Sequence, residues 1–311
     1  MRPIGWGVVD EQRRGIALGL AAYLVWGFLT VYWKALQGLN AFQLIGARII
    51  SSFVLLAAFL VLTRRWRGLG ILRRDRSVLG LVTIAAVLLT ANWTAYVWAV
   101  VHDDVIQTAL GYFIAPLGTV LIGVVALREH LRPAQKVALA LAAVAVVELT
   151  LSYGRVPVVA LIISTSWAFY GLLKRRIPMG VFEGLTGETL VLLVPAVAVV
   201  ALPAVAGHGL ATQGSTGQMV LVVFSGLATA TPLLMFAGAA RRVPFTLLGP
   251  MQYIVPTINF LLGVFLYHEP LAASQVVGFA LVWVGLIVFT VDSIRSVRTA
   301  PAAPVPATVA P

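Results

Sequence analysis

The chain has 311 residues, of which 60% are hydrophobic and 11% are charged, and it contains no cysteine. This composition excludes a water-soluble globular domain, a disulfide framework and a thiolate metal site. The formal charge of +11 does not indicate nucleic-acid binding, because the basic residues are scattered between apolar runs instead of gathering on one surface. We expect a protein surrounded by a lipid bilayer, with no cofactor and no metal ion.

A helix of roughly 20 apolar residues crosses the hydrocarbon core of a membrane. Such runs follow one another along the whole chain and predict an all-α, polytopic membrane protein with ten transmembrane helices. The predicted helices cover residues 15–33, 43–62, 78–100, 106–127, 134–151, 156–173, 184–203, 218–239, 244–267 and 274–291. Residues 1–14 are expected to form an N-terminal segment and residues 293–311 a disordered tail, since the tail ends in a stretch of Ala, Pro, Val and Thr.

The basic residues alternate between successive loops. Those after the second, fourth, sixth and eighth runs are rich in Lys and Arg, whereas the opposite side carries only Lys34 and Arg155. Because positively charged loops remain in the cytoplasm, both termini are predicted to be cytoplasmic. The alternation also favours an even number of spans.

The two halves of the chain resemble each other. A shift of 140 positions aligns the fourth and fifth runs with the ninth and tenth, and it matches polar and helix-breaking residues that apolar composition alone does not produce. These matches are Pro116 with Pro256, Gly123 with Gly263, Glu129 with Glu269 and Gln135 with Gln275. Each half contains five predicted helices, so residues 154–292 enter the membrane from the side opposite to residues 15–153. Such inverted repeats place a substrate site near the bilayer midplane.

Several motifs resemble those of the drug/metabolite transporter superfamily, in its EamA family and among the RarD-type permeases. They are AAYLVWG at residues 21–27, the pair Ala47-Arg48, the pair Asn92-Trp93, LGYFIAP at 110–116, WAFYGLLKRR at 167–176, ETL from Glu188 and QYIVPT at 252–257. Ala115 departs from the Asn expected there, and Arg128 stands where Gly is usual before Glu129. The resemblance implies a ten-helix, inverted-repeat transporter of the plasma (inner) membrane, with a family name associated with chloramphenicol sensitivity.

Ionisable residues inside the predicted spans are the first candidates for a substrate site, because each costs roughly 2.5–3.5 kcal/mol on insertion scales. Arg48 either binds the carboxylate of a substrate or serves as a structural cation. Glu188 either carries a coupling proton, binds a cationic substrate, or is a first-turn acid that the helix dipole favours. Glu148 is predicted to form a structural ion pair with Arg48.

Aromatic and polar side chains near mid-helix form the second group of candidates. Their rings and amides either line a cavity for aromatic or amphipathic solutes or pack between helices. This group comprises Trp26, Trp93, Trp167, Tyr112, Tyr170, Tyr253, Asn92 and Gln252. Pro116 and Pro256 remove backbone hydrogen bonds at equivalent points and are predicted to act as hinges.

No pattern of a nucleophile with its base, of paired acids or of metal ligands lies within a span, so the protein is not expected to be an enzyme. The prediction is a secondary transporter that moves small metabolites or drug-like solutes by alternating access. A channel and a membrane scaffold without transport remain the alternatives. Proton coupling would pass through Glu188, while the substrate, the direction of transport and the oligomeric state stay open.

Overall fold

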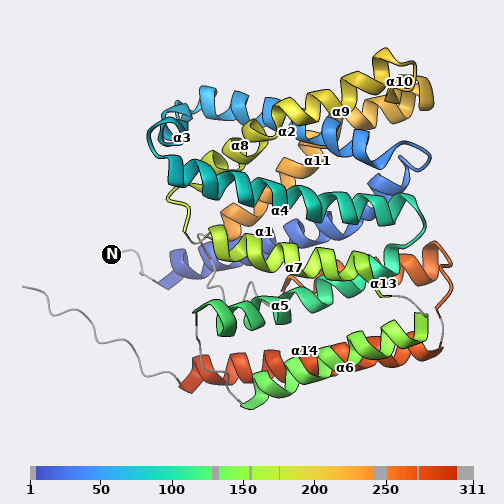
Figure 1. The fold of residues 1–311 in the computed structure, drawn as a ribbon. Coiled ribbons are helices and arrows are strands. Elements are labelled where there is room, and N and C mark those ends of the chain that lie inside the picture. Colours follow the sequence, from blue (N-terminus) through green and yellow to red (C-terminus); the bar gives the residue numbers. More distant parts are fainter. Residues whose placement is uncertain are drawn as a thin grey trace, which may run out of the picture.

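The computed structural model describes residues 5–127, 133–153, 156–174, 176–240, 242, 251–271 and 273–299. Every regular element in these residues is a helix, as the composition predicts. The longer ones are α1 (Gly5–Lys34), α2 (Ala41–Leu62), α4 (Arg76–Val101), α5 (Val105–Leu127), α6 (Pro133–Tyr153), α7 (Val158–Lys174), α8 (Val181–Val191), α9 (Leu193–Val205), α11 (Thr216–Ala240), α13 (Ile254–Leu261) and α14 (Ala273–Thr299). Short elements are η1 (Trp66–Gly70), α3 (Ile71–Arg74), α10 (Leu210–Gln213) and the π-helix η2 (Leu262–Leu266). The long helices lie side by side as a bundle, and their connections gather at its two ends (Figure 1).

The helices have the length and composition of membrane spans. Within the described residues, four are long and apolar enough to cross a bilayer, namely Arg13–Lys34, Ala41–Leu62, Arg76–Val101 and Thr216–Phe236, and the pair α8 and α9 would form a fifth. Five further apolar helices are shorter, at Val105–Ala115, Lys136–Ala145, Val158–Lys174, Ile254–Leu266 and Val276–Val288. Large apolar side chains such as Val61, Val194 and Val223 are exposed on the bundle, where lipid rather than water is the favourable solvent.

Two helix ends differ from the prediction. Helix α1 begins at Gly5 and so extends into the predicted N-terminal segment. Helix α14 continues to Thr299 and takes in the beginning of the predicted disordered tail, since residues 292–299 contain neither Gly nor Pro to stop it. Residues 300–311, the remainder of that tail, lie outside the described residues.

Two predicted spans are interrupted. The run at 184–203 forms α8 and α9, which meet at an angle of 46°. Pro195 explains this bend, because it offers no amide N–H to the preceding turn and its ring collides with the carbonyl of that turn. The run at 244–267 is described only from residue 251, and α13 starts there at Ile254.

Side-chain caps fix the start of two long helices. The side chain of Asn40 accepts hydrogen bonds from the backbone amides of Phe42 and Gln43 at the start of α2, at 3.0 and 3.2 Å. Asp75 does the same for Ser77 and Val78 at the start of α4, at 2.8 and 3.2 Å. These oxygens satisfy amide groups that have no partner within the helix.

Helices at related positions in the two halves make corresponding contacts with helices of the other half. Helix α1 packs against α11 and α13, and α7 packs against α4 and α5 in the same way. The contact of α2 with α11 corresponds to that of α8 with α4, while α6 and α14 pack against each other at one edge of the bundle (Figure 1). The pairing follows the shift seen in the sequence, which relates α6 to α14.

Close packing of α2 against α11 depends on Gly226. A Cβ atom on this residue would lie 2.5 Å from the carbonyl of Ser51, which is backbone and cannot move aside. We therefore expect Gly226→Ala to destabilise the protein by about 1–3 kcal/mol, because an overpacked contact forces the two helices apart. The measurement is the melting temperature of the purified protein in detergent.

Gly80→Ala in α4 is the matched control, since nothing lies within 4 Å of the added methyl group. It should leave the protein as stable as before or stabilise it by up to about 1 kcal/mol. Equal melting temperatures of the two variants would contradict the close approach at Gly226.

Candidate functional site

The side chain of Arg48 lies at the centre of the first buried polar cluster. It is 5% exposed, and its guanidinium carbon is 4.1 Å from the ring centre of Trp93 and 5.0 Å from that of Trp33. Its Nε donates a hydrogen bond of 3.0 Å to the hydroxyl of Thr229. Four helices, α1, α2, α4 and α11, therefore meet at one cation, held within the described residues by cation–π contacts and one hydrogen bond.

Asn92 and Tyr112 belong to the same region. The Asn92 amide donates to the carbonyl of Ile163 at 2.9 Å and to the hydroxyl of Ser166 at 3.1 Å, while Tyr112 donates to its oxygen at 3.4 Å. The ring of Tyr112 meets that of Tyr96 edge to face at 5.9 Å. Both tyrosines are within electrostatic range of Arg48, so three of the predicted residues, Asn92, Trp93 and Tyr112, gather beside it.

A chain of buried hydroxyl and amide groups continues from Tyr96. Its hydroxyl lies 2.8 Å from that of Thr30, which donates to the Asn259 oxygen at 2.7 Å, and the Asn259 nitrogen donates to Thr108 at 3.2 Å. The chain joins α1, α4, α5 and α13. Sequence reasoning left Trp33, Tyr96, Thr30 and Thr229 out of the site, although polar residues within apolar runs were a usable signal for three of them.

The second buried cluster surrounds Glu188. Its carboxylate is fully buried and accepts from Lys174 at 2.7 Å and from the Tyr170 hydroxyl at 3.1 Å. The interpretation as a first-turn acid was wrong, because Glu188 lies in the second half of α8. Glu183 occupies that first turn and pairs with Arg65 at 3.0 Å.

The two clusters occupy related positions in the sequence. Shifts of 141 and 140 positions relate Trp33 to Lys174 and Arg48 to Glu188. Each pair makes contact across the same two helices of its half, α1 with α2 and α7 with α8. The first half thus holds a cation against an indole ring where the second half holds an ion pair.

The predicted ion pair between Arg48 and Glu148 was wrong. Glu148 is on α6, which packs against α14 and α5, whereas Arg48 is on α2 among α1, α4 and α11. Within the described residues, the ion pairs do not include one between these two side chains. Two helices on separate sides of α5 cannot bring the two groups together.

Trp26, Trp167, Gln252 and Tyr253 are not among the side chains that contact Arg48 within the described residues. Trp26 packs on Tyr23 and Phe236, at ring distances of 5.5 and 5.8 Å, and Trp167 is 5.9 Å from Tyr170 and partly exposed. Gln252 and Tyr253 form the turn before α13, and Tyr253 packs against a separate apolar cluster.

The two predicted hinges are not equivalent in the structure. Pro116 lies within α5, whereas Pro256 lies in the first turn of α13. A proline costs no hydrogen bond in a first turn, because the amide groups there have no partner inside the helix. Met251 is helical, Gln252 and Tyr253 form a turn and α13 begins at Ile254, so the helix is interrupted one turn before Pro256, and the role of both prolines as hinges stays a prediction.

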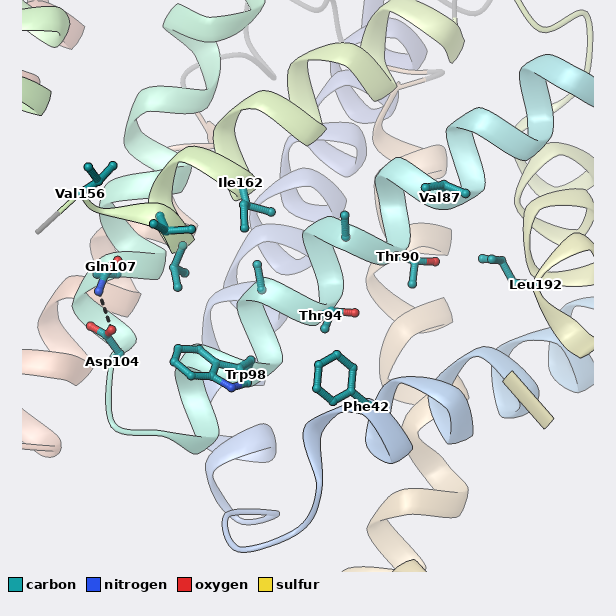
Figure 2. Close-up of a pocket in the computed structure, with 14 residues that line it drawn as sticks. Phe42, Val87, Thr90, Thr94, Trp98, Asp104, Gln107, Val156, Ile162 and Leu192 are labelled. Atoms are coloured by element: carbon teal, nitrogen blue, oxygen red, sulfur yellow. Dashed lines mark hydrogen bonds between the residues drawn. The ribbon is translucent and has the colours of Figure 1, made fainter. Parts of the chain in front are cut away.

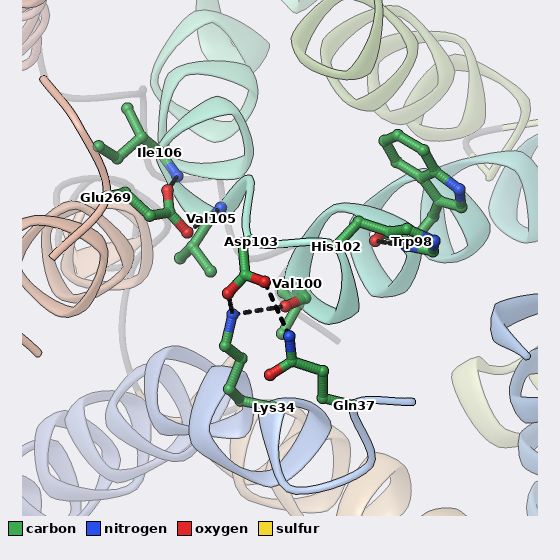
Figure 3. A network of polar contacts seen from close by, with 9 residues as sticks. All are labelled: Lys34, Gln37, Trp98, Val100, His102, Asp103, Val105, Ile106 and Glu269. Atoms are coloured by element: carbon green, nitrogen blue, oxygen red, sulfur yellow. Dashed lines mark hydrogen bonds and ion pairs between the residues drawn. The ribbon is translucent and has the colours of Figure 1, made fainter. Parts of the chain in front are cut away.

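A third network closes the end of the bundle that carries the loop from α4 to α5 (Figure 3). Lys34 forms an ion pair with Asp103, and Gln37 donates to the same carboxylate at 2.7 Å. Nearby, Glu269 accepts from the backbone amides of Val105 and Ile106, at 2.7 and 2.8 Å, and so caps α5 from the other half of the chain. The hydrogen bond from Lys34 keeps the pKa of Asp103 below its usual value.

A groove of about 790 Å³ lies along α4, lined on that helix by residues such as Val87, Thr94 and Trp98 (Figure 2). Its walls come from α2, α4 and α7 and are largely apolar, with exposed side chains such as Phe42, Val87 and Trp98. None of the predicted site residues lines it. The part of the chain that the structure describes contains no group of three or more His, Cys, Asp and Glu side chains placed to hold a metal ion.

Apolar helices with exposed hydrophobic surfaces and buried polar clusters define a multi-pass helical membrane protein. The chain belongs to the EamA-like transporter family, whose family model matches it twice, over residues 13–151 and 155–291. It is therefore a membrane transporter by family, and some of its curated relatives are named transporters.

Full-length relatives agree with this assignment. Protein RarD of Streptomyces exfoliatus is 39% identical over 93% of this chain and 92% of its own length. Uncharacterized transporter YojE of Bacillus subtilis is 36% identical over 92% and 96%, and Protein RarD of Escherichia coli is 34% identical over 93% and 97%. A solved crystal structure, 20% identical, aligns with a TM-score of 0.60 over 90% of this chain and 99% of its own, which shows a common fold.

The ion pair of Lys34 with Asp103 gives a pH-dependent contribution to stability. Because the pKa of Asp103 is lowered by folding, this contribution is present above the unfolded pKa of about 3.9 and is lost as the pH falls through the lower folded value. Asp103→Asn should lower the free energy of unfolding at pH 7 by less than about 1 kcal/mol for an exposed pair, and by a smaller amount at pH 3, as melting temperatures at the two pH values would show. Asn is the suitable replacement because residue 103 has φ 60°.

The control repeats Asp103→Asn in a Lys34→Gln background. There the substitution should have little effect at either pH, since the partner charge has gone. An equal loss of stability with and without Lys34 would contradict the assignment.

Proposed function

We propose that this protein is a secondary transporter that moves small metabolites or drug-like solutes across the plasma membrane by alternating access. The observation that carries the proposal is the buried cluster around Arg48. Arg48, Trp33 and Trp93 come from the first half of the chain and Thr229 comes from the second. Polar and charged groups are costly inside a bilayer and commonly mark a substrate path where the halves meet.

The proposed architecture is ten spans arranged as two inverted five-helix repeats, residues 15–153 and 154–292, with both termini in the cytoplasm. Two observations support it: helices at related positions in the two halves make corresponding contacts, and the family model matches each half separately. Counting α8 with α9 and α13 with η2 as single spans gives five apolar helices in each half among the described residues. The distribution of basic loops supports the orientation.

Alternating access requires contacts between the halves at each end that form in turn. At the end carrying the α4–α5 loop, Glu269 caps α5, and Gln218 donates to the carbonyls of Ala35 and Gln37 at 3.2 and 3.3 Å. At the other end, Arg65 pairs with Glu183 and Arg242 with Glu11. These contacts are polar and lie at opposite ends of the bundle, and in this proposal each set acts as a gate that opens while the other holds.

A channel and a non-transporting scaffold make different predictions from a carrier. The test first compares the metabolites inside and outside cells that contain the wild-type protein, Arg48→Gln or the Gly80→Ala control. The solutes whose distribution differs between these cells are then used in proteoliposomes, where their flux is measured. For a carrier we expect saturable flux and counterflow, lost in Arg48→Gln and kept in the control. Non-saturating, ion-like conductance would indicate a channel, and no flux of any solute would indicate a scaffold.

Glu188 is the proposed carrier of a coupling proton. Its carboxylate is buried and accepts hydrogen bonds from Lys174 and Tyr170, so a proton added there would change the charge of the cluster and its pairing. Glu188→Gln should abolish accumulation driven by a pH gradient and should leave counterflow, which needs no net proton movement. The two measurements use the same proteoliposomes with and without the gradient.

Gly80→Ala is the control, because nothing lies within 4 Å of the added methyl group and the residue belongs to neither polar cluster nor to either proposed gate. It should retain accumulation in response to the gradient. Unchanged gradient-driven accumulation in Glu188→Gln would exclude proton coupling through this residue.

A further inference from the structure

We propose that the Arg48 site binds the carboxylate of a small planar aromatic acid, so that the transported solute is an organic anion. This inference rests on the proposed function and names the substrate class of its central site. It is carried by the charge balance of the buried residues, the unused donors of Arg48 and the rings around them.

Arg48 differs from the other buried charged residues that the structure describes. Glu188 is paired with Lys174, Glu183 is paired with Arg65, and Glu269 is bonded to two amides at a helix N-terminus. Arg48 has no carboxylate within ion-pair distance among the described residues. A buried cation without a counter-charge is costly, and a bound anion removes that cost.

The guanidinium also has donors to spare. Nε is occupied by Thr229, whereas Nη1 is buried and has no hydrogen-bond partner within the described residues. A buried donor left unsatisfied costs about 1–3 kcal/mol. The guanidinium edge matches a carboxylate, which accepts two parallel N–H bonds in one plane, better than it matches a single oxygen.

The surroundings favour a planar aromatic body behind that carboxylate. Trp33 and Trp93 lie against the guanidinium, and Tyr96 and Tyr112 are within its electrostatic range. Aromatic rings pack favourably against flat apolar groups in addition to the area they bury. A cationic solute is disfavoured, because it would meet Arg48 without a nearby acid to offset the repulsion.

The related pair in the second half supports the assignment by contrast. There Lys174 meets Glu188, and the cluster is neutral without a ligand. In the first half, Trp33 stands where Lys174 does and Arg48 where Glu188 does, so the pair keeps a net positive charge. Only the first cluster therefore needs an anion to complete it.

The experiment uses three probes of the same shape and different charge: benzoate, benzamide and benzamidine. Calorimetric titration of the full-length protein in phosphatidylcholine nanodiscs, which lack anionic lipid, measures their affinities. We expect benzoate to bind on the order of ten- to a hundredfold more tightly than benzamide, as one charge-assisted bidentate contact implies, and benzamidine to bind most weakly. Arg48→Gln should remove the preference for benzoate, and Gly80→Ala should keep it.

Arg48→Lys provides a second variant that retains the charge without the planar fork. It should weaken benzoate binding and leave benzamide binding unchanged, and it carries the test if Arg48→Gln does not fold. Wild-type protein that binds benzoate no better than benzamide, or not at all, overturns the assignment. The two proposals fail separately. Counterflow of other solutes without benzoate binding would overturn the aromatic acid as the substrate and leave the transporter proposal standing. Benzoate binding without counterflow of any solute would overturn the transporter proposal and leave the anion site standing.

Discussion

The absence of water from the bilayer interior is the constraint on which the rest of this structure depends. Backbone groups in the hydrocarbon must be satisfied within the chain, which restricts the described residues to helices. The same constraint applies to polar side chains, so Asn92, Thr30 and Asn259 are found in hydrogen-bonded chains that cross from helix to helix. These hydrogen-bonded chains determine which helix faces meet, because apolar side chains are as stable against lipid as against another helix and so do not select a partner.

Against that background Arg48 stands out. Its indole and hydroxyl neighbours stabilise a cation without neutralising it, and its open donors lie beside aromatic side chains. A purely structural role would be served better by the kind of pairing seen at Glu188 and Lys174. The unbalanced charge is therefore best understood as half of an interaction that a ligand completes.

The two halves use one scaffold for different chemistry. Helix contacts correspond between the halves, and related positions face the interior in both, yet they carry an arginine beside tryptophan in one and a carboxylate beside lysine in the other. In the proposed function, the cluster around Arg48 binds the substrate and the cluster around Glu188 carries the coupling proton. Polar contacts join the halves at both ends of the bundle, and the proposed alternating access requires these two sets of contacts to break in turn.

The sequence by itself determined the class of protein and the position of most helices, and it singled out Arg48 and Glu188 as ionisable residues inside predicted spans, because apolar length and the place of a charge within it are local properties of the chain. It also located most helix ends to within a few residues, as for α2 and α5. It missed the start of α1 and the end of α14, where the helix extends beyond the apolar run. Only the tertiary structure decided the partners. Depth along a helix suggested Glu148 for Arg48, but depth does not specify which neighbour a helix face meets, and packing placed Trp33, Trp93 and Thr229 there instead.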